Sequence, residues 1–446
     1  MIRVGVRRLP VRQLLERMIG EAVRAVDPGR ALTQHLRRTG ATLFLGTKRY
    51  ALPKGRRVVV VGAGKAAATM ARAVEGILGP HLEGGCVVTK YHHRVPTKRI
   101  EVVEAGHPVP DEAGVAAGRR ILDLVRSLKT SDLLLVLISG GASSLLPAPA
   151  PGLTLADKQR VTGLLLKSGA SIQEVNTVRK HLSAIKGGQL AAATKARVLS
   201  FILSDVLGDD LASIGSGPTA PDPTTFREAL STLRRYRLIT KVPPAVRAHL
   251  QAGARAARRE TPKPGSTVFR RVQHHIIGNN QAAVSAVARV AWRRGIRPLV
   301  LTTTLTGEAR VAAQAFGALA RQVSERGRPL MRPCCILAGG ELTVTVKGRG
   351  QGGRAQEFAL AAAKDIAGLR NLWIVGVGTD GTDGPTDAAG AVVDGRTWQR
   401  AQAKGCRPAR ALAENNAYPL LKRLGQLIHT GPTGTNVNDL YLLLAL

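Results

Sequence analysis

Gly62-Ala63-Gly64-Lys65 is the first segment of the sequence whose residue types and spacing could do chemistry. It follows the aliphatic run 58–61 and precedes an alanine-rich helical pattern, so it predicts a turn between a buried strand and a helix. Glycines in such a turn let backbone N–H groups approach an anion, and a lysine there suits a carboxylate or a phosphate. A glycine turn with an ordinary surface lysine is the alternative interpretation.

The same turn fits the loose dinucleotide pattern G-x-G-x-x-A through Gly62, Gly64 and Ala67. That pattern also requires an Asp or Glu about 20 residues further on, at the end of the next strand. The next predicted strand ends in Lys90 instead of an acid, so NAD binding is disfavoured. A dinucleotide with a 2′-phosphate stays possible, because Lys90 could bind that phosphate. The full Walker sequence GxxxxGK[ST] is absent from the turn.

A second strand-end turn is rich in small and hydroxyl residues. The aliphatic run 133–138 leads into Ser139-Gly140-Gly141-Ala142-Ser143, which predicts either an anion-binding turn or a helix cap by Ser143. The turn lacks the G-x-S-x-G pattern, so a serine hydrolase is disfavoured.

Cations gather in residues 176–188. Arg179 and Lys186 lie seven residues apart, so a helix would place them on one face, where they suit a polyanion. A solvated charged face is the alternative, and spacing alone favours it.

Two glycine-rich turns hold aspartates in a chain that is poor in acids. Asp205 follows the apolar run 199–203, and Asp380 and Asp383 follow the run 373–377. Mg²⁺ prefers one or two carboxylates together with substrate phosphates and water, whereas Asp in such turns often only caps the backbone. Both interpretations stay open for each aspartate.

Two more glycine-rich turns lie near the C-terminus. One presents the Arg354 guanidinium where a helix starts, and guanidinium recognises carboxylate or phosphate with two hydrogen bonds. The other carries Asn436 and Asn438. Repeated anion-binding turns, two acidic turns and no redox-metal motif favour a phosphate-handling enzyme over a dehydrogenase.

The elements that position these turns are aliphatic strands alternating with helices, which indicates parallel sheets covered on both faces. Ligands then bind outside the carboxyl ends of the strands, where the turns lie. Pro, Gly and charge mark a linker within 242–271. We predict an α/β fold of two α/β domains with mainly parallel sheets: a larger Rossmann-like domain at residues 1–250 and a smaller one at 270–446.

The composition excludes several classes of protein. The 446 residues include 65 Lys and Arg against 30 Asp and Glu, a net charge of +35, with 44% hydrophobic residues. This apolar fraction excludes a disordered chain, and no aliphatic run reaches the ~20 residues that span a bilayer. The bases are scattered and only 3% of residues are aromatic, so specific nucleic-acid binding is disfavoured. The four cysteines show no CxxC spacing, which indicates free thiols in a reducing cytoplasm.

Taken together, the motifs resemble the class II glycerate kinases, the glycerate 2-kinases with a C-terminal MOFRL domain. The resemblance runs from about residue 15 to the end. It is carried by the strings VGAGKAA, EAGHPVPDEAG, SGGASSLL, NTVRKHLSAIKGGQLA, SDVLGDDLASIGSGPT, IGNNQAA, TGEAR, LAGGELTVTVKG, GTDGTDGPTDAAGA and HTGPTGTNVNDL. Two departures stand out, since the family usually has Asn at position 355 and Thr at position 342, where this chain has Ala355 and Leu342.

The resemblance implies ATP-dependent phosphorylation of D-glycerate to 2-phosphoglycerate with Mg²⁺, in a cleft between two domains. For this reaction, our hypothesis assigns Lys65 and Arg354 to the reacting phosphate and the glycerate carboxylate. In the same hypothesis, Asp205, with Asp380 or Asp383, holds Mg²⁺ or the attacking hydroxyl. Substrate or nucleotide would be bound by the remaining site residues Gly62, Gly64, Ser139, Gly140, Gly141, Ser143, Arg179, Lys186, Glu341, Asn436 and Asn438.

Two other functions stay open. The first is an NAD(P)H-dependent hydroxypyruvate reductase, a name that relatives of this family have often carried. The second is a protein without enzymatic activity that binds anions or RNA through its charge. For the kinase we expect glycerate and ATP as the only specific partners, no membrane contact, a cytoplasmic location and an oligomeric state open to a homodimer.

Overall fold

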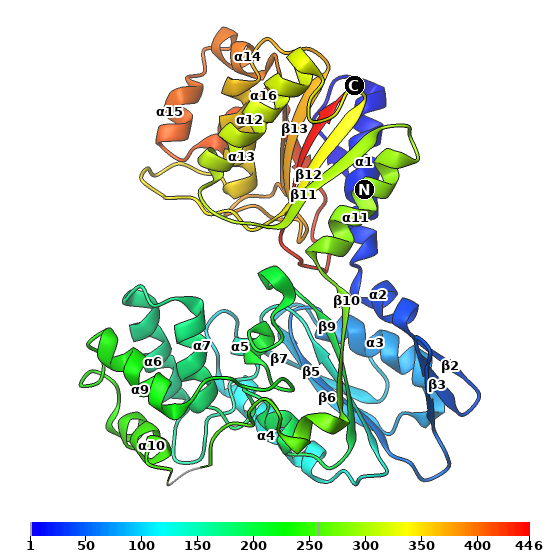
Figure 1. The fold of residues 1–446 in the computed structure, drawn as a ribbon, viewed down its shortest axis with the longest axis vertical. Coiled ribbons are helices and arrows are strands. Elements are labelled where there is room, and N and C mark those ends of the chain that lie inside the picture. The colour runs from blue at the N-terminus through cyan, green and yellow to red at the C-terminus, as the bar shows by residue number, and fades with distance from the viewer. Residues whose placement is uncertain (1, 257–258) are drawn as a thin grey trace. The chain divides into compact units, whose positions relative to one another are not determined.

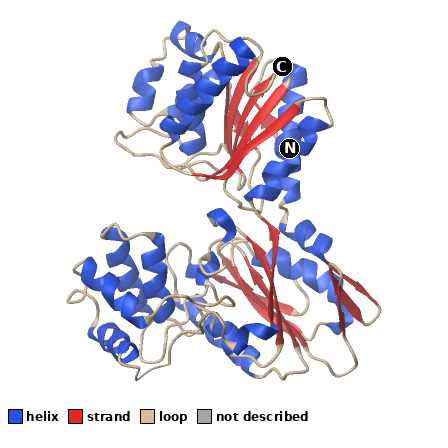
Figure 2. Ribbon diagram, viewed as in Figure 1, coloured by secondary structure: helices blue, strands red, loops and turns tan. Residues whose placement is uncertain are grey.

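The computed structural model describes residues 2–256 and 259–446. The chain forms two compact units, each with its own sheet (Figures 1 and 2). The first unit is Pro28–Ile277, and the second joins the residues up to Asp27 with Gly278–Leu446. The α/β class is confirmed.

The first unit is built on a six-stranded sheet in the order β10-β9-β8-β5-β6-β7. The pairs β5–β6, β6–β7, β5–β8 and β8–β9 are parallel. Numbered along the chain, this is the order 3-2-1-4-5-6 of doubly wound nucleotide-binding sheets, which reverses between β5 and β8. The strands are β5 (Val58–Ala63), β6 (Gly84–Lys90), β7 (Ile100–Ala105), β8 (Leu133–Ile138), β9 (Arg197–Leu203) and β10 (Val272–Gly278).

Both faces of this sheet are covered, because consecutive residues of its central strands are apolar and alternate between the two faces. Val58 and Val60 pack with α3 (Ala67–Leu78), whereas Val59 and Val61 pack with α4 (Glu112–Arg126) on the opposite face. The predicted parallel sheet with buried faces is therefore confirmed in this unit.

Two smaller parts complete the first unit. A helical part has its own apolar core and comprises α6 (Leu155–Lys167), α7 (Ile172–His181), α9 (Phe226–Arg235) and α10 (Pro244–Ala254). An antiparallel meander, preceded by α2 (Pro28–His35), comprises β2 (Leu36–Thr39), β3 (Thr42–Leu45) and β4 (Lys48–Ala51). The short helices are α5 (Ala142–Leu145) and α8 (Gln189–Ala192), with 3₁₀ turns at Gly79–His81, Leu207–Asp209, Ile214–Ser216 and Thr267–Arg271.

The second unit has a seven-stranded sheet in the order β1-β15-β14-β13-β16-β12-β11. Only β11–β12 is parallel among its pairs in the described residues, and the others are antiparallel. The prediction of a mainly parallel sheet is wrong here, because the connections from β13 to β14 and from β15 to β16 hold no crossover helix. The strands are β1 (Arg3–Val4), β11 (Arg297–Leu305), β12 (Cys334–Gly340), β13 (Leu372–Gly378), β14 (Gly390–Asp394), β15 (Leu427–His429) and β16 (Asp439–Ala445).

Helices cover this mixed sheet. Phe316 of α12, Phe358 of α13 and Leu421 of α16 share one apolar core with Ile336 and Tyr441 of the sheet. The helices are α1 (Leu9–Ala25), α11 (Asn280–Trp292), α12 (Ala309–Arg326), α13 (Arg354–Asp365), α14 (Thr397–Ala403), α15 (Pro408–Ala413) and α16 (Ala417–Leu424). No helix among the described residues is both long and apolar enough to span a bilayer.

The unit bounds differ from the predicted ranges 1–250 and 270–446 at both ends. The apolar face of α1 is buried against α11, and β1 pairs with β15, so the basic N-terminal segment is folded into the second unit. Strand β10 lies within the predicted second range, yet it belongs to the sheet of the first unit. Contacts with distant segments decide where the N-terminal segment and β10 belong. The local sequence does not show which distant segment a short strand or a helix face will contact.

Candidate functional site

Two predicted turns interlock where the strand order of the first sheet reverses. The 62–65 turn follows β5 and the 139–144 turn follows β8, and β5 and β8 are neighbours. A Cβ on Gly62 would overlap the carbonyl oxygen of Leu137, and one on Gly64, whose φ is +140°, would overlap Ser139 Oγ. Both glycines are therefore needed for close approach of the two turns.

The backbone N–H groups of the first turn are used within the protein. Gly64 N donates to Val88 O at 3.0 Å and Lys65 N donates to Gly140 O at 2.8 Å. Ala66 N donates to Ser139 Oγ at 3.0 Å. These three N–H groups fix the turn, so the group that this turn offers to an anion is the Lys65 side chain.

Lys65 lies among other polar groups at the carboxyl edge of the sheet. His107, two residues beyond β7, lies close enough to Gly141 that a Cβ there would crowd its ring. Burial, together with the positive charges of Lys65 and Lys90, lowers the pKa of His107 to about 4. The imidazole is therefore neutral at pH 7, and Lys65 and Lys90 form a positive field at the ends of β5 and β6.

Asp205 provides the carboxylate of this group. It follows β9, and a Cβ on Gly140 would overlap its Oδ2. Gly140 therefore has a neighbour on each side: its carbonyl oxygen accepts a hydrogen bond from Lys65 N, and its Cα lies against the Asp205 carboxylate. The structure thus brings together Lys65, Ser139, Gly140, Gly141 and Asp205, as predicted from their positions at strand ends.

Ser143, Arg179 and Lys186 lie where the sheet meets the helical part. Lys186 Nζ donates to Ser143 O at 2.8 Å, and Ser143 Oγ lies 2.7 Å from Ser216 Oγ. Lys186 is only 2% exposed and Arg179 is partly buried. The charge run is therefore a buried group of cations rather than the solvated face that spacing favoured.

Arg354 is the centre of a second site, in the other unit. Its Nε and Nη2 donate to the two oxygens of Asp439 at 2.5 and 3.1 Å, and its Nη1 donates to Glu341 at 2.7 Å. Burial tends to lower the pKa of Arg354, but the hydrogen bond and charge of Asp439 raise it, so the guanidinium is fixed as a cation. Tyr441 donates to Asp439 at 2.8 Å and fixes the carboxylate in turn.

Asp380 and Asp383 take different places in their turn. The Asp383 carboxylate is 4% exposed and accepts the N–H groups of Ala355 at 3.1 Å and Gln356 at 2.8 Å. It caps the start of α13, and its burial raises its pKa to about 7. Asp380 is partly exposed, and its Oδ1 accepts the N–H of Thr382 at 3.0 Å. Among the described residues, no three His, Cys, Asp or Glu side chains gather as a metal site.

The asparagine turn packs beside Asp439. Asn436 Oδ1 accepts the N–H of Asn438 at 3.0 Å, and Asn438 has a left-handed φ of +66°. Asn280 Nδ2 donates to Val437 O at 2.8 Å and to Asp439 O at 3.0 Å. The buried Asn280 side chain therefore fixes the turn in place.

Both departures from the family pattern are apolar side chains in the interior. Ala355 is 0% exposed and Leu342 is 1% exposed. Asp439 and Glu341 orient Arg354 without any contribution from the side chain at position 355.

The fold and these sites match known proteins. Residues 14–251 match a domain of unknown function, DUF4147, and residues 334–439 match the MOFRL family. A glycerate 2-kinase of Pyrococcus horikoshii is 44% identical over 97% of both chains. The chain belongs to the glycerate 2-kinase family.

Other members of the glycerate 2-kinase family agree with the fold. The crystal structure of a glycerate kinase from Thermotoga maritima is similar with a TM-score of 0.88 and 41% identity, covering 98% of this chain and 100% of that one. A protein of Agrobacterium vitis that is provisionally named as a hydroxypyruvate reductase is 42% identical over 97% of this chain and 94% of its own.

Sequence reasoning missed two polar residues of these sites in the glycerate 2-kinase fold, His107 and Asp439. Each lies next to a strand end, His107 after β7 and Asp439 at the start of β16. The strand-end argument that selected Lys65 and Asp205 would have found His107, had it been applied to every strand. It could not have found Asp439, which begins a strand antiparallel to its neighbours, so that its start lies beside their carboxyl ends.

Proposed function

We propose that this chain is a glycerate 2-kinase that transfers a phosphoryl group from ATP to the 2-hydroxyl of D-glycerate. The observation that carries the proposal is the position of Lys65 at the reversal point of the sheet, where Gly141 lies near Lys65 and the adjacent Gly140 lies against Asp205. Open parallel sheets bind ligands at this point, and phosphoryl transfer depends chiefly on positioning and charge stabilisation. The names of the similar proteins support the same substrate.

Lys65 and Arg354 supply the positive charge in this proposal, one for the reacting phosphate and the other for the glycerate carboxylate. Arg354 uses three of its five N–H groups on Asp439 and Glu341, so two remain for a ligand. Its fixed orientation means that little entropy is lost when a substrate oxygen binds.

We assign each carboxylate to metal binding or to helix capping from its exposure and its hydrogen-bond partners. Asp205 and Asp380 are partly exposed and suit Mg²⁺, which when bound neutralises phosphate charge. Both oxygens of Asp383 already accept backbone hydrogen bonds, so we assign it to the helix start rather than to the metal. Asp205 lies in one unit and Asp380 in the other, and each is proposed on its own surroundings.

The remaining predicted residues shape the site. Gly62, Gly64 and Ser139 hold the two strand-end turns together, and Gly140 and Gly141 leave room for Asp205 and His107. Ser143, Arg179 and Lys186 are proposed to bind an anionic part of a substrate, and Asn436 and Asn438 to shape the turn beside Asp439. Glu341 is proposed as a partner of Arg354.

A hydroxypyruvate reductase is the competing function. The reductase requires NAD(P)H, and the strand after the first glycine turn ends in Lys90 where the ribose-binding acid would lie. The N–H groups that would face a pyrophosphate are also bonded within the protein.

The deciding experiment measures ADP release in a coupled assay with D-glycerate, ATP and Mg²⁺, and identifies the product. We expect glycerate-dependent ADP and 2-phosphoglycerate. NAD(P)H oxidation with hydroxypyruvate, without ADP release, would establish the reductase instead. Tight and salt-sensitive RNA binding without ATP turnover would favour the protein without enzymatic activity.

For the cellular setting we propose the cytoplasm. The cysteines Cys86, Cys334, Cys335 and Cys406 are all free, as expected of a protein kept in a reducing compartment.

A further inference from the structure

Three cations lie together in the first unit, and one of them, Lys158, escaped the sequence analysis. Lys158 comes from α6, Arg179 from α7 and Lys186 from the segment that follows α7. Lys158 is 7% exposed and Lys186 is 2% exposed. Burial, then the neighbouring positive charge of Arg179, lowers the pKa of Lys158 to about 7, and burial followed by Lys158 and Arg179 lowers the pKa of Lys186.

The partners of these cations inside the protein are uncharged. Lys158 Nζ donates to Leu182 O at 3.0 Å and Lys186 Nζ donates to Ser143 O at 2.8 Å. No carboxylate of the described residues lies within 4 Å of any of the three. The neighbouring Lys180 differs, because its Nζ lies 3.3 Å from the buried Asp222 carboxylate. Lys180 is thus a buried lysine with a counter-ion, whereas the neighbouring Lys158, Arg179 and Lys186 form no ion pair with a carboxylate of the described residues.

Polar groups surround the same place. Ser143 Oγ lies 2.7 Å from Ser216 Oγ, and Ser216 donates to Asn176 Oδ1 at 3.3 Å. Asn176 precedes Arg179 by about one helical turn, and Lys186 Nζ donates to Ser143 O, so hydroxyl and amide groups lie next to the cations. Buried charge without a counter-ion destabilises a fold unless a ligand compensates it.

We infer that Lys158, Arg179 and Lys186 form a binding site for an oxyanion, the carboxylate or phosphoryl group of a substrate or product. Arg179 supplies a guanidinium, and Lys158 and Lys186 supply amines whose charged form a bound anion would favour. Together with the Ser143 hydroxyl they match the donors that such a group needs. The identity of the ligand rests on the proposed function, whereas the existence of the anion site does not. Lys158 is thereby added to the residues that determine substrate binding.

The test compares thermal unfolding of the full chain with and without inorganic phosphate, D-glycerate or ATP. For the unsubstituted protein we expect each true ligand to raise the unfolding midpoint (Tm), because it binds only the folded state. Lys158→Met removes the charge and keeps the length of the side chain. We expect this variant to have a higher Tm in anion-free buffer, to lose the anion-dependent rise, and to bind the ligand at least tenfold more weakly by calorimetry.

A merely structural lysine predicts the reverse result. Loss of its bond to Leu182 O would then lower the Tm and leave the anion-dependent rise intact, and that outcome overturns the site. The exposed Lys167 on the same helix gives the matched control, Lys167→Met, which should change neither quantity. If Lys158→Met does not fold, the partly buried Arg179→Gln takes its place, and a retained rise in that variant overturns the site equally.

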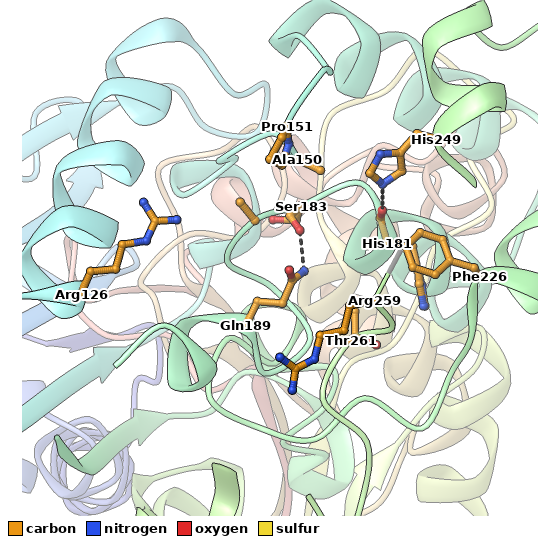
Figure 3. Close-up of a pocket in the computed structure, with 11 residues that line it drawn as sticks. Arg126, Ala150, Pro151, His181, Ser183, Gln189, Phe226, His249, Arg259 and Thr261 are labelled. Atoms are coloured by element: carbon orange, nitrogen blue, oxygen red, sulfur yellow. Dashed lines mark hydrogen bonds between the residues drawn. The ribbon is translucent and has the colours of Figure 1, made fainter. Parts of the chain in front are cut away.

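A cationic pocket elsewhere in the first unit provides the competing location for phosphate. It has a volume of about 310 Å³ and is lined by Arg126, Gln189, His249 and Arg259, among others (Figure 3). If Arg259→Ala abolishes the phosphate-dependent rise and Lys158→Met does not, phosphate binds in this pocket and the inference is wrong.

Comparing D-glycerate with ATP shows whether the bound anion is the substrate carboxylate or a nucleotide phosphate. A loss confined to D-glycerate assigns the site to the substrate carboxylate, and a loss confined to ATP assigns it to a nucleotide phosphate. If the protein shows no kinase activity but phosphate still stabilises it through Lys158, the proposed function fails and the anion site stands. No rise with any of the three compounds overturns the site.

Discussion

At the scale of single residues, the proposed chemistry depends on Lys65, whose backbone N–H and side-chain ammonium have separate tasks. Lys65 N–H is bonded to Gly140 O, which leaves the ammonium group directed by a rigid turn. Such a preorganised charge stabilises a transition state without reorganisation during the reaction.

We predict that Lys65→Met lowers kcat at least ~10²-fold, the usual effect of removing one preorganised electrostatic partner. The exposed Lys54 allows the control Lys54→Met, which should stay within about twofold of the unsubstituted enzyme, as surface substitutions usually do. The measurement is the rate of ADP release at saturating glycerate and ATP. A near-normal rate for Lys65→Met would remove this residue from the mechanism.

At the scale of elements, α7 positions Arg179, and its N-terminal cap makes stability depend on pH. Ser171 and Glu174 form a capping box, and Tyr236 donates to Glu174 at 2.7 Å. The hydrogen bond from Tyr236 and those from Ser171 lower the pKa of Glu174 to about 2. The helix that carries the cation is thus fixed by a carboxylate at its opposite end.

The lowered pKa of Glu174 gives a stability prediction with a definite sign. The charged carboxylate stabilises the folded state fully above its ordinary pKa of about 4.5, and this contribution is lost as the pH falls toward about 2. We expect Glu174→Gln to cost about 1 kcal/mol near neutral pH, the typical value of a cap, and progressively less in acid. Denaturant titrations followed by circular dichroism at several pH values measure it. The exposed Glu112, in the first turn of α4, supplies the control Glu112→Gln; an equal effect there would contradict the prediction.

At the scale of the whole molecule, the N-terminal helix belongs with the C-terminal part of the chain. Leu15 of α1 is 0% exposed in a face that packs on α11. All three tryptophans, Trp292, Trp373 and Trp398, lie in the same unit, so tryptophan fluorescence reports its unfolding alone.

We predict that Leu15→Ala destabilises this unit by about 2–5 kcal/mol through the cavity that it creates. The fluorescence transition in urea should shift to lower denaturant concentration. Leu9→Ala is the control, because Leu9 is 49% exposed and its loss should change stability by no more than about 0.5 kcal/mol. An unchanged fluorescence transition in Leu15→Ala would instead place residues 1–27 with the first unit, as the predicted range 1–250 had it.

The net charge of +35 also acts at the scale of the whole molecule. Most of it lies outside the sites, where it attracts anionic substrates over distances of about a Debye length. We predict that raising the ionic strength from about 0.05 to about 0.3 M lowers kcat/KM for ATP severalfold and leaves kcat within about twofold. Steady-state kinetics with added potassium chloride measure both. A kcat/KM that is independent of salt would show that the surface charge plays no part in substrate capture.

The sequence by itself determined the α/β class and the parallel sheet of the first unit, and it placed most strand-end residues of the candidate site. Hydrophobic periodicity, apolar runs and glycine turns are local features of the sequence. Parallel strands then bring their carboxyl ends to one edge of the sheet, where the turns meet. Lys65, Asp205 and the Ser139 turn could therefore be placed together before any coordinates were known.

Only the tertiary structure decided which charges are compensated and which segments pair. Sequence spacing favoured a solvated charged face for Arg179 and Lys186. It also could not tell whether Asp383 caps a helix or binds a metal ion. Both questions depend on burial and hydrogen-bond partners, which distant segments of the chain provide. The antiparallel strands of the second sheet and the place of α1 likewise depend on contacts far apart in the chain. The sequence states which residues are charged, and the packing of distant elements sets the surroundings that give each charge its role.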